Sequence, residues 1–252
     1  MTAPPELWQV PAADPIPADQ VPTDPAGEFL SNWVAELIFQ HSITTARSLA
    51  RTVGPSGLGT ACDKELSYGA HGMPRVNFGT DPWAAIVGTA VHEWMAALFR
   101  SLDGGAGRFL VEAKASYRQV SGTADLYDRR TRTVIDWKTT KAGKIRTIRK
   151  TAPPPNYVTQ IHTYGAGLEA GGESPERVAL VFLPVDGKLT DVHAWVAPYD
   201  RSIANQAIDR YEGLRAAPLE AAAPSPSRLC EWCDYHQPRG GSGCPGNFKG
   251  EM

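Results

Sequence analysis

The feature that most constrains the fold is a set of three short segments between residues 108 and 140 that are rich in β-branched and aromatic side chains. They are RFLVEAKASYRQ, SGTADLYD and RTVIDWKTT, and turn-prone stretches such as DRRT separate them. This composition and spacing predict three consecutive strands joined as a β-meander. The meander is the centre of the fold that we expect.

Helical and extended segments alternate around this meander. Residues 81–102 have helical periodicity and open on Asp81 and Pro82, which are suited to a helix start. A second helix is expected over 156–172, because this segment has helical periodicity and its last two residues are glycines suited to a helix C-cap. Further segments follow in the order strand, strand, helix: 177–185, 190–197 and 200–217. The sequence therefore predicts an α/β fold with a mixed central sheet flanked by helices.

The remaining segments suggest one domain with decorations. Residues 1–26 are proline-rich and are expected to form an extended tail, with a single domain over 27–252. Residues 28–51 carry apolar side chains at helical spacing, which predicts a core-facing amphipathic helix. These side chains are Phe29, Trp33, Leu37 and Ile38. Residues 54–74 resemble a glycine-rich connection and residues 141–155 a basic loop.

Charge and hydropathy set limits on partners. The chain has 252 residues, a net charge of -2 and a pI near 6.3, so any contact with nucleic acid must come from a local patch. It has no signal-like N-terminus and no apolar run of membrane-spanning length. A soluble, cytoplasmic protein without a membrane partner is expected. In that reducing compartment, the four cysteines are expected to bind metal or to be buried rather than to form disulfides.

The segment TVIDWKTTK places an acid and a lysine two residues apart. Side chains alternate along a strand, so Asp136 and Lys138 share one face while Trp137 points to the other. Antiparallel pairing with the preceding segment, GTAD, can bring Asp125 beside Asp136. Two carboxylates next to a lysine suit Mg²⁺ or Mn²⁺, with Lys138 placed to act on a water or on developing negative charge. The alternative is an exposed ion pair that contributes little.

Two helical motifs bear on this choice. GTAVH places His92 four residues after Gly88, and QIHTY places Gln160 and Tyr164 four apart, on one helix face. The ordered set GTAVH, GTAD, VIDWK and QIHTY resembles the RecB-like branch of the PD-(D/E)xK nuclease superfamily. In that branch the motifs run GxxxH, GxxD, (D/E)xK and QxxxY. Four weak motifs in the right order form a specific signal.

The resemblance implies a restriction-endonuclease-like core and a role for each motif residue. The implied ligands of Mn²⁺ or Mg²⁺ are His92, Asp125, Asp136 and the backbone carbonyl of Trp137. Lys138 becomes the catalytic lysine, and Gln160 and Tyr164 are implied to contact the DNA strand and to help position the scissile phosphate. Glu112 resembles an acidic position that often precedes GxxD, and it stands as a second site candidate beside the alternative of a surface acid.

A basic stretch surrounds the last strand of the meander. Residues 129–150 hold nine Lys or Arg residues against one acid. Beside a metal site, such a stretch is suited to track phosphates, because its cations release counterions from nucleic acid. The expected nucleic-acid contacts are Lys141, Lys144, Arg146, Arg149, Lys150 and Tyr157. The tyrosine is a candidate for stacking on a base, with ordinary core packing as the alternative. A solvated charged face is the alternative.

The cysteines form a separate pattern. Cys230 and Cys233 have a metal-ligand spacing, ten residues lie between Cys233 and Cys244, and Cys62 precedes the meander. This layout resembles the iron-sulfur branch of the same family, including the CRISPR-associated exonuclease and the AddB-type nuclease domain. It implies a [4Fe-4S] cluster that fastens a C-terminal staple, about residues 228–246, to the body. A structural Zn²⁺ would use the same four ligands and remains open.

Taken with the resemblance, these patterns favour a metal-dependent DNA exonuclease. Its expected substrates are single strands or duplex ends in recombination, repair or phage DNA metabolism. A helicase or recombinase partner is left open. Two alternatives remain: a non-catalytic DNA-binding or assembly module with the same fold, and a zinc-stabilised RNA nuclease.

Overall fold

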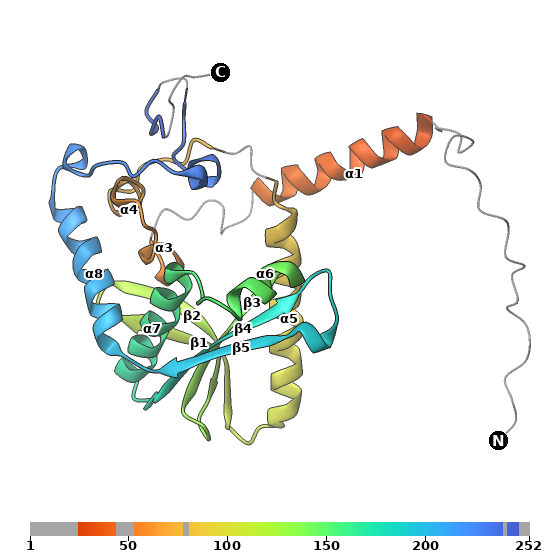
Figure 1. The fold of residues 1–252 in the computed structure, drawn as a ribbon, viewed down its shortest axis with the longest axis vertical. Coiled ribbons are helices and arrows are strands. Elements are labelled where there is room, and N and C mark those ends of the chain that lie inside the picture. The colour runs from red at the N-terminus through yellow and green to blue at the C-terminus, as the bar shows by residue number, and fades with distance from the viewer. Residues whose placement is uncertain (1–24, 44–52, 78–80, 239–240, 247–252) are drawn as a thin grey trace, which may run out of the picture. The chain divides into compact units, whose positions relative to one another are not determined.

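The computed structural model describes residues 25–43, 53–77, 81–238 and 241–246 (Figure 1). The α-helices are α1 (Pro25–Ile43), α3 (Pro55–Leu58), α4 (Asp63–Ala70), α5 (Trp83–Asp103), α6 (Ala142–Ile148), α7 (Pro155–Ala170) and α8 (Arg201–Ala216). The strands are β1 (Phe109–Tyr117), β2 (Val120–Asp128), β3 (Thr133–Thr140), β4 (Arg177–Pro184) and β5 (His193–Pro198). Short 3₁₀ helices are η2 (Leu189–Asp191), η3 (Leu219–Ala221) and η4 (Arg228–Trp232).

The five strands form one mixed sheet in the order β1-β2-β3-β4-β5. The first three pair antiparallel, as expected for a meander, and β5 is antiparallel to β4. Strand β4 runs parallel to β3, which requires the chain to cross back over the sheet, and α6 and α7 lie on this crossover. The predicted α/β fold, with a mixed sheet flanked by helices, is confirmed.

Helix α7 packs closely on one face of the sheet. The larger core cluster combines side chains of α7 with those of the strands, among them Ile161, Tyr164, Leu168, Val134, Val178 and Leu180. Gly167 allows the close approach of helix and strand. A Cβ at Gly167 would lie 2.6 Å from the carbonyl carbon of Ala115 on β1. The glycine therefore fixes how near α7 comes to the sheet.

Helix α5 lies against the opposite face. Trp137 on β3 is 5% exposed, and its ring stacks on Phe99 of α5 with the centroids 5.5 Å apart. The next residue, Lys138, contacts α7 instead. Since adjacent strand residues point to opposite faces, α5 and α7 cover the two sides of β3. This places the predicted motifs of both helices beside the same strand.

A second core cluster lies where α3, α4 and α8 meet the start of β2. It consists of Leu58, Leu66, Val120, Ile208 and Tyr211. The chain that follows α8 returns to this region, where the Val76 amide donates to the Asp234 carbonyl at 2.9 Å and Asn77 Nδ2 donates to the Cys233 carbonyl at 3.0 Å. Residues far apart in the sequence thus lie side by side near α4.

Two stretches expected to lack regular structure contain helices. The expectation of a loop over 141–155 is wrong, because α6 forms with Ala142, Ile145 and Ile148 buried along one side. The glycine-rich connection over 54–74 contains α3 and α4, which bury Leu58 and Leu66. In α6, apolar residues at helical spacing carried a weak signal that the surrounding charges obscured.

Helix α1 belongs to a compact unit of residues 1–48, separate from the unit of residues 49–252. It covers only part of the helix expected over 28–51, and residues 44–52 lie outside the described residues. Phe29, Trp33 and Leu37 are 71%, 51% and 50% exposed. The core-facing side of this helix stays a prediction. The predicted tail lies outside the described residues up to residue 24. None of the helices in the described ranges is long and apolar enough to span a bilayer.

Candidate active site

The register of β2 and β3 sets the two predicted acids across from each other. The last paired residues are Leu126 and Ile135, and the next positions along the strands are Asp125 and Asp136. The pairing of β2 with β3 ends at this point, so the backbone of β3 facing β2 is free to take a side-chain partner. The Trp137 amide donates to Asp125 Oδ2 at 2.8 Å. Asp125 is thereby held against β3 near Asp136.

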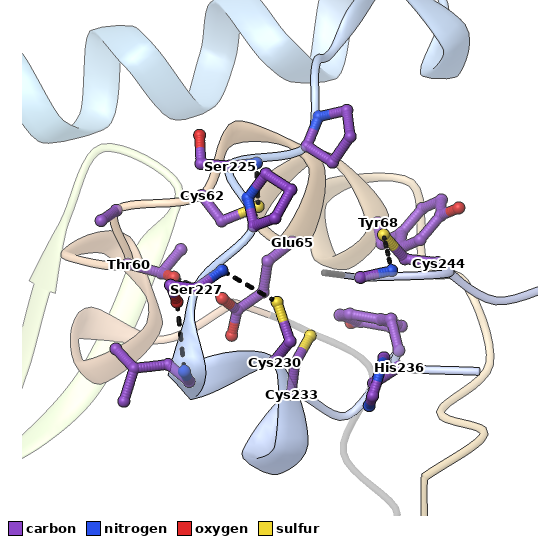
Figure 2. A pocket seen from close by; sticks show the side chains of 16 residues that line it. Thr60, Cys62, Glu65, Tyr68, Ser225, Ser227, Cys230, Cys233, His236 and Cys244 are labelled. Atoms are coloured by element: carbon purple, nitrogen blue, oxygen red, sulfur yellow. Dashed lines mark hydrogen bonds between the residues drawn. The ribbon is translucent and has the colours of Figure 1, made fainter. Parts of the chain in front are cut away.

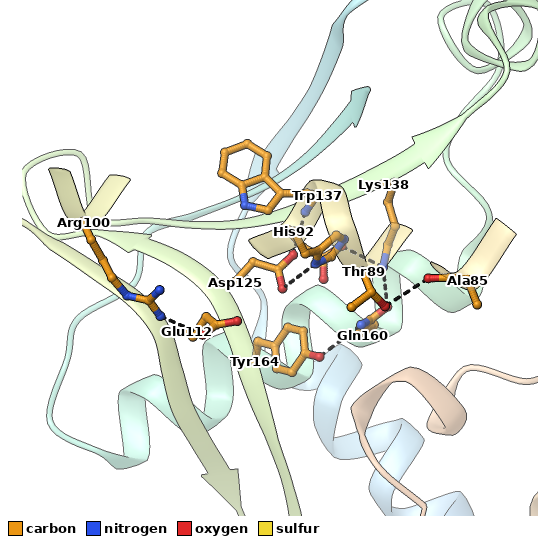
Figure 3. A network of polar contacts seen from close by, with 11 residues as sticks. Ala85, Thr89, His92, Arg100, Glu112, Asp125, Trp137, Lys138, Gln160 and Tyr164 are labelled. Carbon is orange, nitrogen blue, oxygen red and sulfur yellow. Dashed lines mark hydrogen bonds and ion pairs between the residues drawn. The ribbon is translucent and has the colours of Figure 1, made fainter. Parts of the chain in front are cut away.

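Helix α5 brings His92 to the same place (Figure 3). His92 Nδ1 lies 3.3 Å from Asp125 Oδ1. The hydrogen bond with Asp125 raises the pKa of His92 above its ordinary value, against the opposing effect of burial. One turn earlier, a Cβ at Gly88 would lie 3.3 Å from Thr139 Oγ1, so the glycine keeps α5 close to β3. The GTAVH motif thus positions the imidazole over the strand ends.

Asp136 and Lys138 form a buried pair. Asp136 is 1% exposed, and its Oδ2 lies 2.7 Å from Lys138 Nζ. The two atoms form an ion pair, and among the described residues Oδ2 has no partner with hydrogen-bond geometry. Burial raises the pKa of Asp136 to about 6, and the charge of Asp125 adds to this while Lys138 opposes it. The exposed ion pair, the alternative interpretation of this motif, is thus not what the structure contains.

The QIHTY motif contacts the lysine from α7 (Figure 3). Lys138 Nζ donates to Gln160 Oε1 at 2.8 Å, and Gln160 Nε2 donates to Tyr164 Oη at 3.1 Å. Gln160 and Tyr164 are each 7% exposed. A continuous line of polar contacts therefore runs from Asp136 to Tyr164. The expected contact of Gln160 and Tyr164 with DNA stays a prediction.

The donor atoms around Asp125 are suited to a divalent cation. As they stand, no three His, Cys, Asp or Glu side chains in the described part of the chain gather closely enough to hold one. An imidazole and two carboxylates nevertheless form a donor set that Mn²⁺ and Mg²⁺ accept. The buried Asp136 Oδ2 without a hydrogen bond is an oxygen that a cation would satisfy. His92, Asp125, Asp136 and the Trp137 carbonyl remain the predicted ligands.

Glu112 lies beside this site in an unusual conformation. It falls between the pairs that join β1 to β2, across from Asp125, and its φ of 49° is left-handed. Such a backbone costs about 1–2 kcal/mol for a residue other than glycine. Its carboxylate accepts a hydrogen bond from Arg100 Nη2 at 2.7 Å. Sequence reasoning did not single out Arg100, since a lone arginine on a helix carries no pattern.

The predicted phosphate-binding cations surround α6. Lys141, Lys144, Arg146, Arg149 and Lys150 are all exposed. Arg146, Arg149 and Lys150 line a cavity of about 520 Å³, and Arg149 also donates to two backbone carbonyls near η2. Tyr157 lines a small cavity with Lys144 but is only partly exposed. Its ring lies against Lys138, with Nζ 4.6 Å from the ring centroid.

All four cysteines line one cavity of about 320 Å³ (Figure 2). Three of their sulfurs accept backbone hydrogen bonds, each at 3.4 Å: Cys62 from Ser225, Cys230 from Ser227, and Cys244 from Gly246. Burial raises the pKa of Cys233 to about 12. The four cysteines that the sequence pattern grouped thus line one cavity, although within the described residues no three of them lie close enough together to hold a metal ion. Their role as ligands stays a prediction.

Other residues of this cavity were missed. Glu65, Tyr68, Tyr235 and His236 also line it. The backbone of His236 pairs with that of Cys244 in an isolated bridge. The available signal was the segment CEWCDYH, which puts a histidine three residues after the second cysteine.

Solved structures similar to this chain include three proteins. The protein SSO0001 is 15% identical, with 82% of this chain and 94% of that chain covered and a TM-score of 0.45. An alkaline exonuclease from Laribacter hongkongensis is 14% identical, with coverages of 68% and 89% and a TM-score of 0.48. A phage-related exonuclease from Haemophilus somnus 129PT is 12% identical, with coverages of 52% and 69% and a TM-score of 0.41. A search of curated proteins found no match.

A family model gives a firmer assignment. The model of the PD-(D/E)XK nuclease superfamily matches residues 109–237, more than half of the 252 residues. The match begins with β1 and includes Asp125, Asp136 and Lys138, whereas His92 and Cys62 precede it. The acids and the lysine that the structure brings together thus lie inside the matched segment. The chain belongs to the PD-(D/E)XK nuclease superfamily.

Proposed function

We propose that the protein is a divalent-metal-dependent DNA exonuclease of the RecB-like branch, acting on single strands or duplex ends in recombination, repair or phage DNA metabolism. The observation that carries the proposal is the buried Asp136 carboxylate, which keeps one oxygen without a hydrogen bond 2.7 Å from Lys138. A buried, incompletely partnered charge is costly and is typical of functional sites. The order of the four motifs supports the RecB-like branch.

Each side chain of the site has a separate proposed role in phosphodiester hydrolysis. Water attacks phosphorus and loses a proton to solvent, and a P–O bond to the new hydroxyl forms. The P–O bond to the leaving sugar oxygen breaks, and that oxygen takes up a proton from solvent. Lys138, held by Asp136 and Gln160, orients the water and stabilises the negative charge that develops on the phosphate. When Mn²⁺ or Mg²⁺ is bound by His92, Asp125 and Asp136, it supplies Lewis-acid chemistry at this site.

DNA is proposed to bind at the basic surface around α6 rather than through the net charge of the whole protein. The exposed cations on and around α6 contribute the positive charge that a chain of net charge -2 otherwise lacks. Binding is therefore expected to weaken steeply with salt. Gln160 and Tyr164 are proposed to help position the strand. We also propose that residues 27–252 form one domain and that the protein is cytoplasmic. A helicase or recombinase is the kind of partner that such a nuclease would have.

The cysteine cavity is proposed to hold a [4Fe-4S] cluster that staples residues 228–246 to Cys62. A structural zinc draws four sulfurs to about 2.3 Å from one ion. The cavity of about 320 Å³ that the cysteines line together with twelve other residues has room for a larger group. Hydrogen bonds from backbone amides to three sulfurs suit thiolate ligands. Anaerobic purification with metal analysis and a visible spectrum tests this, since a colourless protein containing zinc would replace the cluster with a zinc site.

The nuclease proposal is tested with end-labelled DNA in Mn²⁺ and in Mg²⁺. Linear single strands and blunt duplexes should be shortened, whereas a closed single-stranded circle should resist. Asp125→Ala and Lys138→Ala should each lose at least about 100-fold in rate. Exposed Lys114→Ala and Asp209→Ala serve as matched controls and should stay within about twofold.

Three results would change the proposal. Equal cleavage by wild type, Asp125→Ala and Lys138→Ala would remove the proposed site. Metal-indifferent DNA binding without cleavage would favour the non-catalytic module. Preferential cleavage of an RNA strand of the same sequence would favour the RNA nuclease.

A further inference from the structure

Tyr157 extends the lysine-facing side of α7 by one turn. It lies in the first turn of the helix, three residues before Gln160 and seven before Tyr164. Residues at i, i+3 and i+7 share a helix face. The face that carries the QIHTY motif therefore begins one turn earlier than the motif does.

The tyrosine is one of three groups around the Lys138 ammonium. Nζ lies 4.6 Å from the centroid of the Tyr157 ring, 2.8 Å from Gln160 Oε1 and 2.7 Å from Asp136 Oδ2. A cation over the face of an aromatic ring is attracted by the ring quadrupole, and more strongly where water is excluded. The Lys138 side chain is 16% exposed, so little water competes.

The space beside this contact is small. Lys138 and Tyr157 line a cavity of about 50 Å³ together with Lys144, Ile148 and Phe182. A cavity of this size has room for water, and the Lys138 ammonium already lies over one face of the Tyr157 ring. The ring face that meets Lys138 is therefore closed to base stacking, which was the role expected from the sequence.

We propose that Tyr157 is a positioning residue for Lys138. This inference rests on the proposed nuclease function, in which Lys138 faces the scissile phosphate. A lysine side chain has four flexible carbons, and two polar partners leave its ammonium able to swing about them. The ring supplies a third, non-polar side to the site, so that the ammonium is held in one place before the substrate arrives.

The decisive experiment varies the ring electronics at constant shape. Tyr157→Phe keeps the ring and should lower kcat by less than about twofold. Successive fluorination of that phenylalanine weakens the quadrupole without changing the packing, so kcat should fall stepwise while KM stays constant. Tyr157→Leu removes the ring and should lower kcat about 3- to 30-fold. A rise in KM with unchanged kcat would instead restore the stacking role, and a flat fluorination series would overturn the proposal.

A second measurement separates this inference from the nuclease proposal. The Hε protons of Lys138, assigned by their absence in Lys138→Arg, should be shifted upfield by the ring. The shift should persist in Tyr157→Phe and vanish in Tyr157→Leu. If the wild type cleaves nothing, the nuclease proposal fails, and these spectra alone decide whether Tyr157 holds the ammonium. An unshifted signal in the wild type overturns the inference.

Discussion

Asp136 Oδ2 and Lys138 Nζ lie 2.7 Å apart, yet the lysine does not compensate the burial of the carboxylate. Burial and the charge of Asp125 together raise the pKa of Asp136 to about 6, in spite of the nearby ammonium. The folded protein therefore holds a proton more tightly than the unfolded chain does. The ionised carboxylate costs stability above pH 6, and this cost disappears as the pH falls toward 4.

Asp136→Asn should therefore gain stability and lose activity. At pH 8 without divalent metal, its free energy of unfolding should exceed that of the wild type by about 1 to 3 kcal/mol, and the gain should shrink at pH 4.5. Cleavage of labelled DNA should fall by at least about 100-fold. Urea unfolding at both pH values measures the first effect. The exposed Glu220→Gln is the control, and an equal gain there would show that the effect is not specific to the buried site.

Gln160 and Tyr164 should differ in importance. Gln160 contacts Lys138 directly, whereas Tyr164 accepts a hydrogen bond from the Gln160 amide. Gln160→Leu should lower kcat about 10- to 100-fold, and Tyr164→Phe should lower it less than about fivefold. Steady-state kinetics on single-stranded DNA measures both. Equal losses would show that Tyr164 acts on the substrate itself.

Gly167→Ala should destabilise the fold. The new Cβ would lie 2.6 Å from the carbonyl carbon and 2.7 Å from the next amide nitrogen of β1, so α7 must move away from the sheet. The expected loss in the free energy of unfolding is about 1 to 3 kcal/mol. Gly213→Ala in α8 is the matched control, because a Cβ there meets nothing within 4 Å. It should stabilise by about 0.5 to 1 kcal/mol, and urea unfolding compares the pair.

At position 112, a glycine variant should be more stable than an alanine variant, which is the reverse of the usual order in a strand. The φ of Glu112, 49°, suits glycine. Glu112→Gly should therefore be more stable than Glu112→Ala by about 1 kcal/mol, although both lose the contact with Arg100. Thermal unfolding of the two variants measures the difference. A more stable alanine variant would mean that the left-handed conformation is not maintained at this position.

The strands were predictable because their signals are local, whereas the two helical motifs were recognised from their order in a set that runs from Gly88 to Tyr164. Alternation and turn residues marked β1 to β3, and the ordered motifs marked His92, Asp125, Asp136 and Lys138. Other features depend on how distant segments pack. Ile145 and Ile148 form one buried side of α6, but the surrounding basic residues obscured that pattern. The sequence also offered no sign that Tyr157 would meet a lysine from another element.

Burial was the least predictable property of the site. An acid and a lysine at spacing two look the same on a surface and in an interior, and only the covering helices make the difference. Conversely, Phe29 and Trp33 are residue types that are common in protein cores, but in α1 they are exposed. Periodicity reports which side chains share a face, whereas the neighbouring elements decide whether that face is covered.

The cavity of the four cysteines also has a consequence for biosynthesis. Cys62 is translated before any strand, and Cys230, Cys233 and Cys244 only after all five. A ribosome-bound chain therefore carries one lone thiol while the sheet is being made. The proposed cluster would be fully coordinated only once β1 to β5 have left the exit tunnel, so its insertion would follow the synthesis of the whole nuclease core.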